Sequence, residues 1–307
     1  DATIAAALDV DAALAGGALE HVLESDDMDP AADYDVDLTL DVPMAGHVPM
    51  EPRTAVARFR DDGKLEIWTG TQDAFFARAV VADELHLDED DVVVHGLRTG
   101  GAFGGKTLCT VELEAARLAR AAGRPVKVQW SRRDEFAGNF QRQPSRHRIR
   151  ARLAPDGGID AWWHAFRAGH VIFTSAALGP ILQFATSFVP DMGSKRGALP
   201  PYRARRKRIE FEDVRLPVPT GPWRGLGAGP NSWAIETAID ALARQANRDP
   251  LAFRVGAIAA DQPRLAAVLR QVATLSNWSD RRPDAGRGYG VACGVYKGMS
   301  YAAVVAE

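Results

Sequence analysis

A glycine-rich segment at residues 99–107, TGGAFGGKT, constrains the fold of this chain more than any other feature of its sequence. It follows a short β-branched run at 91–97, which predicts a buried strand, and it precedes a stretch at 108–122 whose apolar residues recur at helical spacing. A strand that turns through glycines into a helix presents backbone N–H groups to a ligand at close range. The sequence therefore predicts that this turn holds an anionic or polar ligand.

Residues Gly100 to Thr107 match the pattern G-x-x-x-x-G-K-[ST], in which Lys106 would contact phosphates and Thr107 a magnesium ion. A P-loop nucleotide hydrolase is therefore one hypothesis. Three features weigh against it: several predicted strands precede the loop, no apolar strand downstream ends in an aspartate, and a second glycine-rich element, WRGLGAG, lies at 223–229 before another helix. We expect both glycine-rich turns to converge on one large ligand, with Arg224 offering a planar set of donors.

The remaining signals mix strands and helices without a strict βαβ order, which favours an α+β fold of mixed sheets with packed helices. Alternating or β-branched runs predict strands at 36–42, 53–59, 64–70, 125–130, 146–154, 158–166, 207–216, 288–298 and 300–307. Helical spacing predicts helices at 75–87, 232–247 and 263–275, and Asp249-Pro250 predicts the start of another. On the helix at 232–247, Glu236, Asp240 and Arg244 are expected on the solvated side.

The chain is expected to divide into three parts. Residues 1–35 are predicted to be a flexible or partial N-terminal segment, and 36–170 a first α+β lobe that carries the loop at 99–107. Residues 171–307 form a second portion with the WRGLG loop and the start of a following lobe, and 170–203, rich in Gly, Pro and Ser, read as a boundary or a long loop.

Charge and apolar content exclude several classes of protein. With 37 basic and 40 acidic residues the net charge is −3, so binding of nucleic acid through bulk charge is not expected. The basic run at 203–208 is interpreted as a solvated strand edge or a docking face. No apolar run approaches the roughly 20 residues of a membrane helix. Cys109 and Cys293 match no metal-binding or redox spacing, so no metal ligand is predicted.

Seven blocks, in this order, resemble the molybdenum hydroxylases, which are the molybdopterin-binding large subunits of the xanthine dehydrogenase and aldehyde oxidase superfamily. The phrases VPTGPWRGLG and GRGYGVA are most similar to the branch of the isoquinoline 1-oxidoreductase β-subunits. The blocks are HVPMEPRTAVA (47–57), LEIWTGTQ (65–72), VVVHGLRTGGAFGGK (92–106), GRPVKVQWSRRDEF (123–136), VPTGPWRGLGAGPNSWAIETAIDALA (218–243), RDPLAFR (248–254) and GRGYGVACGVYKG (286–298).

The resemblance implies a cofactor and the residues that bind it. The cofactor would be molybdopterin, in its molybdenum-bearing cytosine dinucleotide form. The residues carried over onto this sequence as cofactor-binding are Gly101, Phe103, Gly104, Gly105 and Arg224, with Gln72 as support for the loop. Thr107 and Leu226 stand at substrate-pocket positions where purine-oxidising members keep Glu and Phe, so xanthine-like substrates are not expected. His47 is interpreted as a hydrogen-bonded structural residue.

The resemblance also implies an activity and partners. The activity would be hydroxylation of an aldehyde or N-heterocycle with oxygen from water, and electrons would leave through iron–sulfur clusters on a small partner subunit. The general-base Glu of the family is expected beyond Glu307, so no catalytic residue is assigned in this chain. We therefore expect a fragment that needs the remainder of the large subunit and is inactive alone. A catalytically silent fragment or assembly module, which docks but binds no cofactor, stays open as an alternative.

Overall fold

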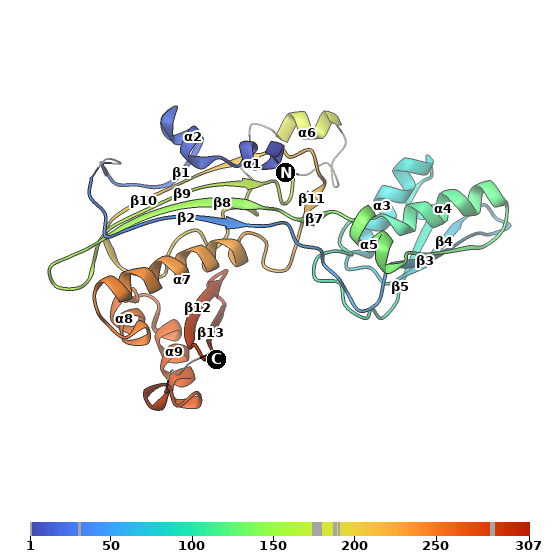
Figure 1. Cartoon of the computed structure of the whole chain (residues 1–307). Helices are drawn as coiled ribbons and strands as arrows, with labels where there is room; N and C mark the ends of the chain where they lie inside the picture. Colours follow the sequence, from blue (N-terminus) through green and yellow to red (C-terminus); the bar gives the residue numbers. More distant parts are fainter. Residues whose placement is uncertain (1, 30–31, 174–179, 187–188, 190, 283–285) are drawn as a thin grey trace.

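A computed structural model of the chain describes residues 2–29, 32–173, 180–186, 189, 191–282 and 286–307. Two bodies, joined by a narrow neck, make up the molecule (Figure 1). The larger is built around a five-stranded sheet and the smaller around a four-stranded sheet, each with packed helices. The predicted class, α+β with mixed sheets, is confirmed.

The larger sheet has the strand order β1-β10-β9-β8-β2. Strands β9 and β10 are parallel neighbours, and the other pairs are antiparallel. Because β9 and β10 lie on either side of residue 170, this sheet crosses the boundary that was expected there. The first strand belongs to residues 1–35, which are therefore tied into the sheet in part. The bounds are β1 (His21–Ser25), β2 (Val36–Val42), β8 (Ser145–Leu153), β9 (Ile159–Gly169) and β10 (Ala204–Val214).

Helices cover both faces of the larger sheet. Helix α7 (Ala228–Gln245) lies along one face, and α1 (Ala2–Ala7) and α2 (Val10–Ala15) lie over the other (Figure 1). Trp162, Phe166 and Ile209 of the sheet are almost completely buried in one core with Ile239 of α7. With both faces covered, most residues of β9 are buried instead of alternating with exposed ones. Beyond α7 follow α8 (Pro250–Ala257), α9 (Pro263–Leu275) and a hairpin of β12 (Gly290–Tyr296) and β13 (Ser300–Ala306).

The smaller body has the strand order β5-β4-β3-β6. Its core of Leu65, Ile67, Val81 and Ala115 lies between this sheet and two helices. Asp73 caps the first of these helices, since its carboxylate accepts the N–H of Phe76 at 2.9 Å. The elements are β3 (Thr54–Phe59), β4 (Leu65–Thr69), α3 (Ala74–Leu85), β5 (Val92–Gly96), α4 (Val111–Ala122), β6 (Val126–Gln129) and α5 (Arg132–Gly138).

Several expected boundaries shift. Helix α4 begins at Val111 instead of residue 108, α7 begins at Ala228 instead of residue 232, and β10 covers 204–214 instead of 207–216. Strand β1 and helix α5 were not predicted, and α6 (Pro180–Thr186) lies in the stretch expected to be irregular. Among the described residues, no helix is both long and apolar enough to cross a bilayer.

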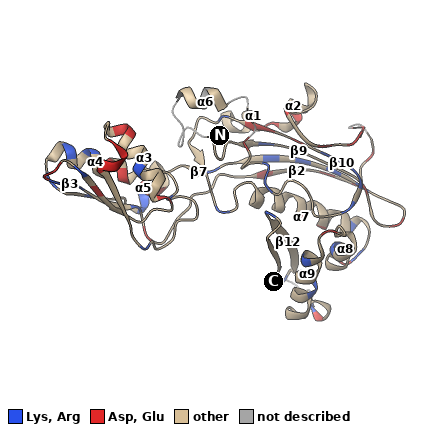
Figure 2. Cartoon of the chain, turned by 180° about the vertical axis from the view of Figure 1, so that it is seen from behind, with Lys and Arg blue, Asp and Glu red and all other residues tan. Residues whose placement is uncertain are grey.

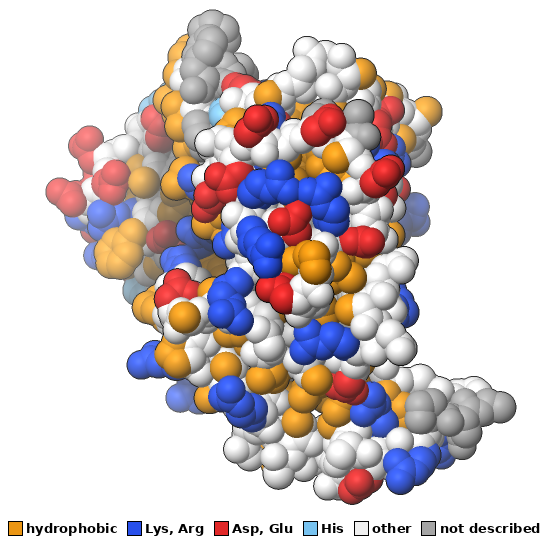
Figure 3. All heavy atoms as spheres, turned by 90° about the vertical axis from the view of Figure 1, so that its left-hand side faces the viewer, with side chains coloured by type: hydrophobic (Ala, Val, Ile, Leu, Met, Phe, Trp, Pro, Cys, Tyr) orange, Lys and Arg blue, Asp and Glu red, His pale blue; other side chains and the backbone are white. Residues whose placement is uncertain are grey.

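Charged residues of both signs are interspersed along both bodies (Figure 2). In the basic run at 203–208, Arg205 pairs with Asp156 at 2.7 Å and Arg206 with Asp160 at 2.8 Å. On the face of the molecule shown in Figure 3, basic and acidic side chains likewise lie next to one another. Much of the charge in this run is therefore balanced within the chain.

Candidate functional site

The glycine-rich loop at 99–107 meets the second glycine-rich loop at the neck between the bodies. The backbone N–H of Arg224 donates to the carbonyl of Phe103 at 3.0 Å. Gly104 has a φ of +96°, and a Cβ built there would overlap the carbonyl oxygen of Pro222 and lie 3.2 Å from Cα of Trp223. Only glycine permits this approach. The two turns therefore meet as expected, and a ligand shared between them remains a prediction.

Gln72, three residues after the end of β4, holds the loop at 99–107 through hydrogen bonds. Its Oε1 accepts the N–H of Gly104 at 3.0 Å and that of Lys106 at 3.3 Å, while its backbone N–H donates to the carbonyl of Lys106 at 2.9 Å. One residue therefore fixes the loop on both sides of Gly105. This is the supporting position that the TQ block predicts, and any contact of Gln72 with a cofactor remains a prediction.

The P-loop hypothesis is wrong on geometry. Lys106 is only 4% exposed, and its Nζ lies 3.3 Å from Oε2 of Glu51 and 3.0 Å from Oγ1 of Thr99, so it is not available to a phosphate. Helix α4 begins only at Val111, four residues after Thr107, so the helix N-terminus does not reach the loop. The pattern matched because a lysine follows the glycines, but here that lysine serves as an internal ion-pair partner.

The loop also carries backbone donors without acceptors. The backbone N–H groups of Gly101, Ala102 and Phe103 have no acceptor among the described residues. Gly101 and Phe103 both have positive φ, at 101° and 55°, the kind of turn in which successive N–H groups form a concave anion-binding nest. The Phe103 side chain is 42% exposed. These groups fit a large polar ligand with an aromatic or apolar face.

Arg224 adds a free cation to this surface. Its side chain is exposed, and within the described part of the chain it has no ion-pair or hydrogen-bond partner. Leu226, two residues on, is half-buried with a φ of +55°, and Thr107 is half-buried with its N–H on the carbonyl of Gly104 at 3.2 Å. Apart from Gln72, which supports them from the side, the predicted cofactor and pocket residues therefore all lie in the two turns that meet at the neck.

His47 contacts both loops, at Pro222 in one and at Gly105 in the other. Its Nε2 lies 2.8 Å from the carbonyl oxygen of Pro222, and its ring packs edge-on against Phe140 with centroids 4.9 Å apart. A Cβ on Gly105 would lie 2.8 Å from the His47 ring, so this glycine permits the contact. Burial lowers the pKa of His47 below its usual value. The interpretation of His47 as a hydrogen-bonded structural residue is confirmed.

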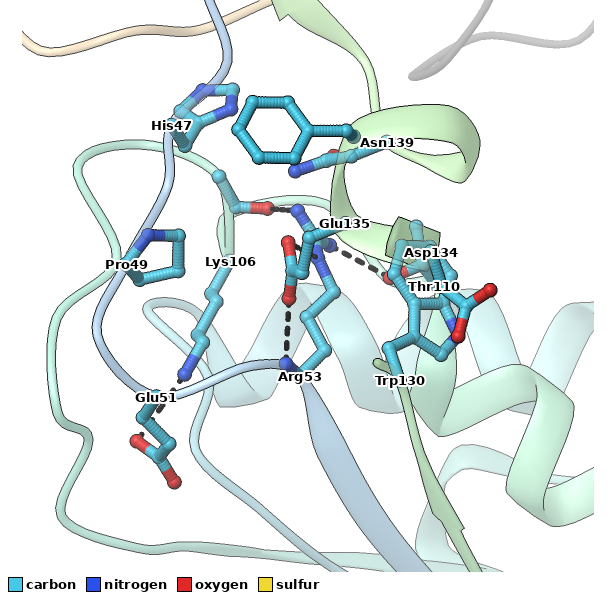
Figure 4. Close-up of polar contacts among 12 residues, drawn as sticks. His47, Pro49, Glu51, Arg53, Lys106, Thr110, Trp130, Asp134, Glu135 and Asn139 are labelled. Carbon is cyan, nitrogen blue, oxygen red and sulfur yellow. Dashed lines mark hydrogen bonds and ion pairs between the residues drawn. The ribbon is translucent and has the colours of Figure 1, made fainter. Parts of the chain in front are cut away.

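Beneath the loop lies a buried polar cluster that the sequence analysis did not single out (Figure 4). Its centre is Arg53, paired with Glu135 of α5. Two features of the sequence could have indicated this cluster. Arg53 is a charged residue directly before an apolar strand, and Ser131 with Asp134 has the spacing of a capping box, which would have predicted α5.

Metal-binding and thiol chemistry find no support in the described residues. No group of three or more His, Cys, Asp and Glu side chains is placed to hold a metal ion there. Cys109 and Cys293 are unpaired, and burial raises the pKa of each thiol to about 12. Both cysteines are therefore poor nucleophiles at neutral pH.

Comparison with known sequences gives a coherent set of relatives. Residues 18–256 match the family model described as molybdopterin cofactor-binding domain. The chain is 35% identical over 242 residues to the beta chain of isoquinoline 1-oxidoreductase from Brevundimonas diminuta, covering 78% of this chain and 30% of that protein. It is 30% identical over 236 residues to a nicotinate dehydrogenase subunit of Pseudomonas putida, covering 76% of this chain and 19% of that protein.

Comparison with solved structures agrees. Aldehyde oxidoreductase from Desulfovibrio gigas matches with a TM-score of 0.70 and 25% identity, over 89% of this chain and 31% of that one. Quinoline 2-oxidoreductase from Pseudomonas putida 86 matches with a TM-score of 0.75 and 23% identity, over 91% of this chain and 38% of that one. The chain spans less than two fifths of the length of each of these four proteins.

Proposed function

This chain belongs to the family of molybdopterin cofactor-binding domains, and from that premise we propose that it forms part of the cofactor-binding subunit of a molybdenum-dependent oxidoreductase. The reaction is hydroxylation of an aldehyde or an N-heterocycle with oxygen derived from water. Relatives named as isoquinoline and aldehyde oxidoreductases support this choice of substrate class. A silent assembly module is the alternative, and the free donors at the neck favour a binding role over it.

One observation carries the proposal: the backbones of Phe103 and Arg224 are brought together, in a loop whose N–H groups at 101–103 have no acceptor among the described residues, next to the exposed side chain of Arg224. In the proposed site, the N–H groups of Gly101 and Phe103 donate to polar atoms of the cofactor, and the exposed guanidinium of Arg224 binds its negative charge. Gly104 and Gly105 allow the close approach, and Gln72 holds the turn. When bound, a molybdopterin cofactor supplies the two-electron redox chemistry.

The finer assignments extend the same proposal. The cofactor is the cytosine dinucleotide form, and electrons pass to iron–sulfur clusters on a small partner subunit. Thr107 and Leu226 line the substrate side of the loops. Glu307 is not assigned as the general base: it directly follows strand β13, and its exposed carboxylate pairs with Arg287 at 2.8 Å. The base belongs to the remainder of the large subunit, which also covers the exposed Phe103 and Arg224.

The test is to produce the full-length protein that contains this chain, together with its partner, and to measure molybdenum by elemental analysis and pterin by absorbance. We expect both to be present, and Arg224→Ala to lower their content. Arg58→Ala is the matched control, because Arg58 is a half-exposed arginine of the smaller body whose only ionic partner is Glu66 among the described residues. An active protein without molybdenum, or unchanged content in R224A, would contradict the proposal.

A further inference from the structure

We propose that Arg53 is a positioning residue that fixes the shape of the loop at 99–107, so that the N–H groups at 101–103, which have no acceptor among the described residues, are held ready for the cofactor. This inference rests on the proposed function. Arg53 lies directly before β3 and does not reach the outer side of the loop, so it acts from beneath (Figure 4).

The Arg53 side chain joins its own segment, just before β3, to three other segments of the smaller body. Its Nη2 donates to the carbonyl of Gly105 in the loop, and its Nη1 donates to Oγ1 of Thr110, the residue before α4, at 2.7 Å. Its Nε lies 3.5 Å from Oε2 of Glu135 in α5. The backbone N–H of Arg53 also donates to Oε1 of Glu135 at 2.6 Å. A planar guanidinium is suited to such divided contacts, because its donors point in fixed directions.

Burial makes these contacts exclusive. Arg53 is 2% exposed and Glu135 5% exposed, and the guanidinium carbon lies 5.3 Å from the ring centroid of Trp130 and 5.7 Å from that of Phe140. Water therefore cannot replace the carbonyl of Gly105 as a partner. Because an unpaired charge at this depth would be strongly unfavourable, the cation and its acceptors hold one another in a single arrangement.

The contact to Gly105 sets the course of the loop. With its carbonyl held from below, Gly105 donates its own N–H to the carbonyl of Ala102 at 2.9 Å, which closes the turn around Phe103. Lys106 holds the far end through Glu51, and Gly100 donates its N–H to the same carboxylate at 2.5 Å. Two buried cations therefore anchor the inner side of the loop, and Gly101, Ala102 and Phe103 are left with N–H groups directed elsewhere.

The test separates this role from a general need for the ion pair. Arg53→Met alone leaves Glu135 buried without its partner and can prevent folding, so the informative protein is the double variant R53M/E135Q. The amide oxygen introduced by E135Q would still accept the N–H of residue 53, while the donor to Gly105 is gone. The matched control is R58M/E66Q, which removes an ion pair between a half-exposed arginine of β3 and a partly buried glutamate of β4 in the same sheet.

The measurement is amide hydrogen exchange on the chain itself, which needs no cofactor. In R53M/E135Q we expect peptides covering 99–107 and 70–73 to exchange at least about tenfold faster, while the larger sheet keeps its protection. The control pair should exchange like the wild type. Arg53→Lys, which keeps one donor, should restore part of the protection. Wild-type protection of the loop in R53M/E135Q would overturn the proposal.

A second measurement addresses the cofactor. In the full-length protein, molybdenum content per folded protein should fall in R53M/E135Q and stay unchanged in R58M/E66Q. A mobile loop with full molybdenum content would overturn the positioning role. If the wild type holds no molybdenum, the proposed function fails, and hydrogen exchange alone then decides whether Arg53 orders the loop.

Discussion

Gly104 offers the sharpest test of the contact between the two loops. In Gly104→Ala, the new Cβ would lie 3.0 Å from the carbonyl carbon of Pro222 and 3.2 Å from Cα of Trp223, at a φ of +96°. The left-handed backbone costs about 1–2 kcal/mol for a residue with a Cβ, and overpacking against rigid backbone costs about 1–3 kcal/mol. We expect the free energy of unfolding to fall by about 2–5 kcal/mol in total.

Two glycines of the same chain separate these terms. Gly63 has a φ of +84° with nothing within 4 Å of an added Cβ, so Gly63→Ala should lose only the backbone term of about 1–2 kcal/mol. Gly229, in α7, has open space and no strained φ, so Gly229→Ala should be neutral or stabilising by up to about 1 kcal/mol. Urea unfolding followed by tryptophan fluorescence measures all three. Equal losses in G104A and G63A would refute the contact between Gly104 and Pro222.

Two further predictions concern buried carboxylates in the larger body. Burial raises the pKa of Asp213 from 3.8 to about 7. Between pH 4 and pH 7 the unfolded chain therefore releases a proton that the folded chain keeps. Over this range the contribution of Asp213 should lower the free energy of unfolding by up to about 1.4 kcal/mol per pH unit. Urea midpoints across this range should decline less steeply in Asp213→Asn, and parallel curves would exclude Asp213 as the cause. Glu236 accepts from Tyr202 at 2.6 Å and from Arg254 at 2.8 Å, so Glu236→Ala should lower the free energy of unfolding by about 3–5 kcal/mol. Asp240 is a second partner of Arg254, and its side chain is one third exposed, so Asp240→Asn should lower the free energy of unfolding much less. Similar losses in E236A and D240N would show that burial does not decide the effect.

Local patterns in the sequence predict most elements of this fold. The hairpin of β3 and β4 follows from β-branched runs around a glycine turn, and α3 follows from apolar spacing after a capping aspartate. The pairing of β1 with β10 joins residues about 190 apart, and no local pattern carries that information. The parallel pairing of β9 with β10 is likewise not encoded in a local pattern. This pairing makes the larger sheet cross the expected boundary near residue 170.

Helix α7 shows where periodicity misleads. Glu236 was expected on the solvated side, yet it is 7% exposed and accepts the N–H of Cys293 at 2.9 Å. Helical spacing predicts that a polar residue faces solvent, but it carries no information about partners from other elements. Here Arg254 and Tyr202 both contact Glu236. Burial of this carboxylate is possible because three donors satisfy it.

In the candidate site, sequence reasoning located the loops but not what holds them. Glycine-rich turns and an arginine within one of them can be recognised in a sequence, because few other residue types can take a left-handed backbone or approach a neighbouring backbone so closely. The supports, Arg53 and Lys106, look like ordinary surface cations or, for Lys106, like a phosphate ligand. Their burial depends on α5 and on Glu51, which are distant in sequence or were not predicted.

The contact between Phe103 and Arg224 also links the two bodies of the molecule, since Phe103 lies between β5 and α4 of the smaller body and Arg224 lies just before α7 of the larger body. A molecule bound across both would oppose any bending at that point. Linkage makes this effect reciprocal. The free energy by which the bound molecule favours one angle between the two bodies equals the binding free energy that it gains when the protein is already held at that angle. Substitutions far from the loops that hold the neck at this angle should therefore tighten binding without touching the bound molecule, and substitutions that hold it at another angle should weaken binding.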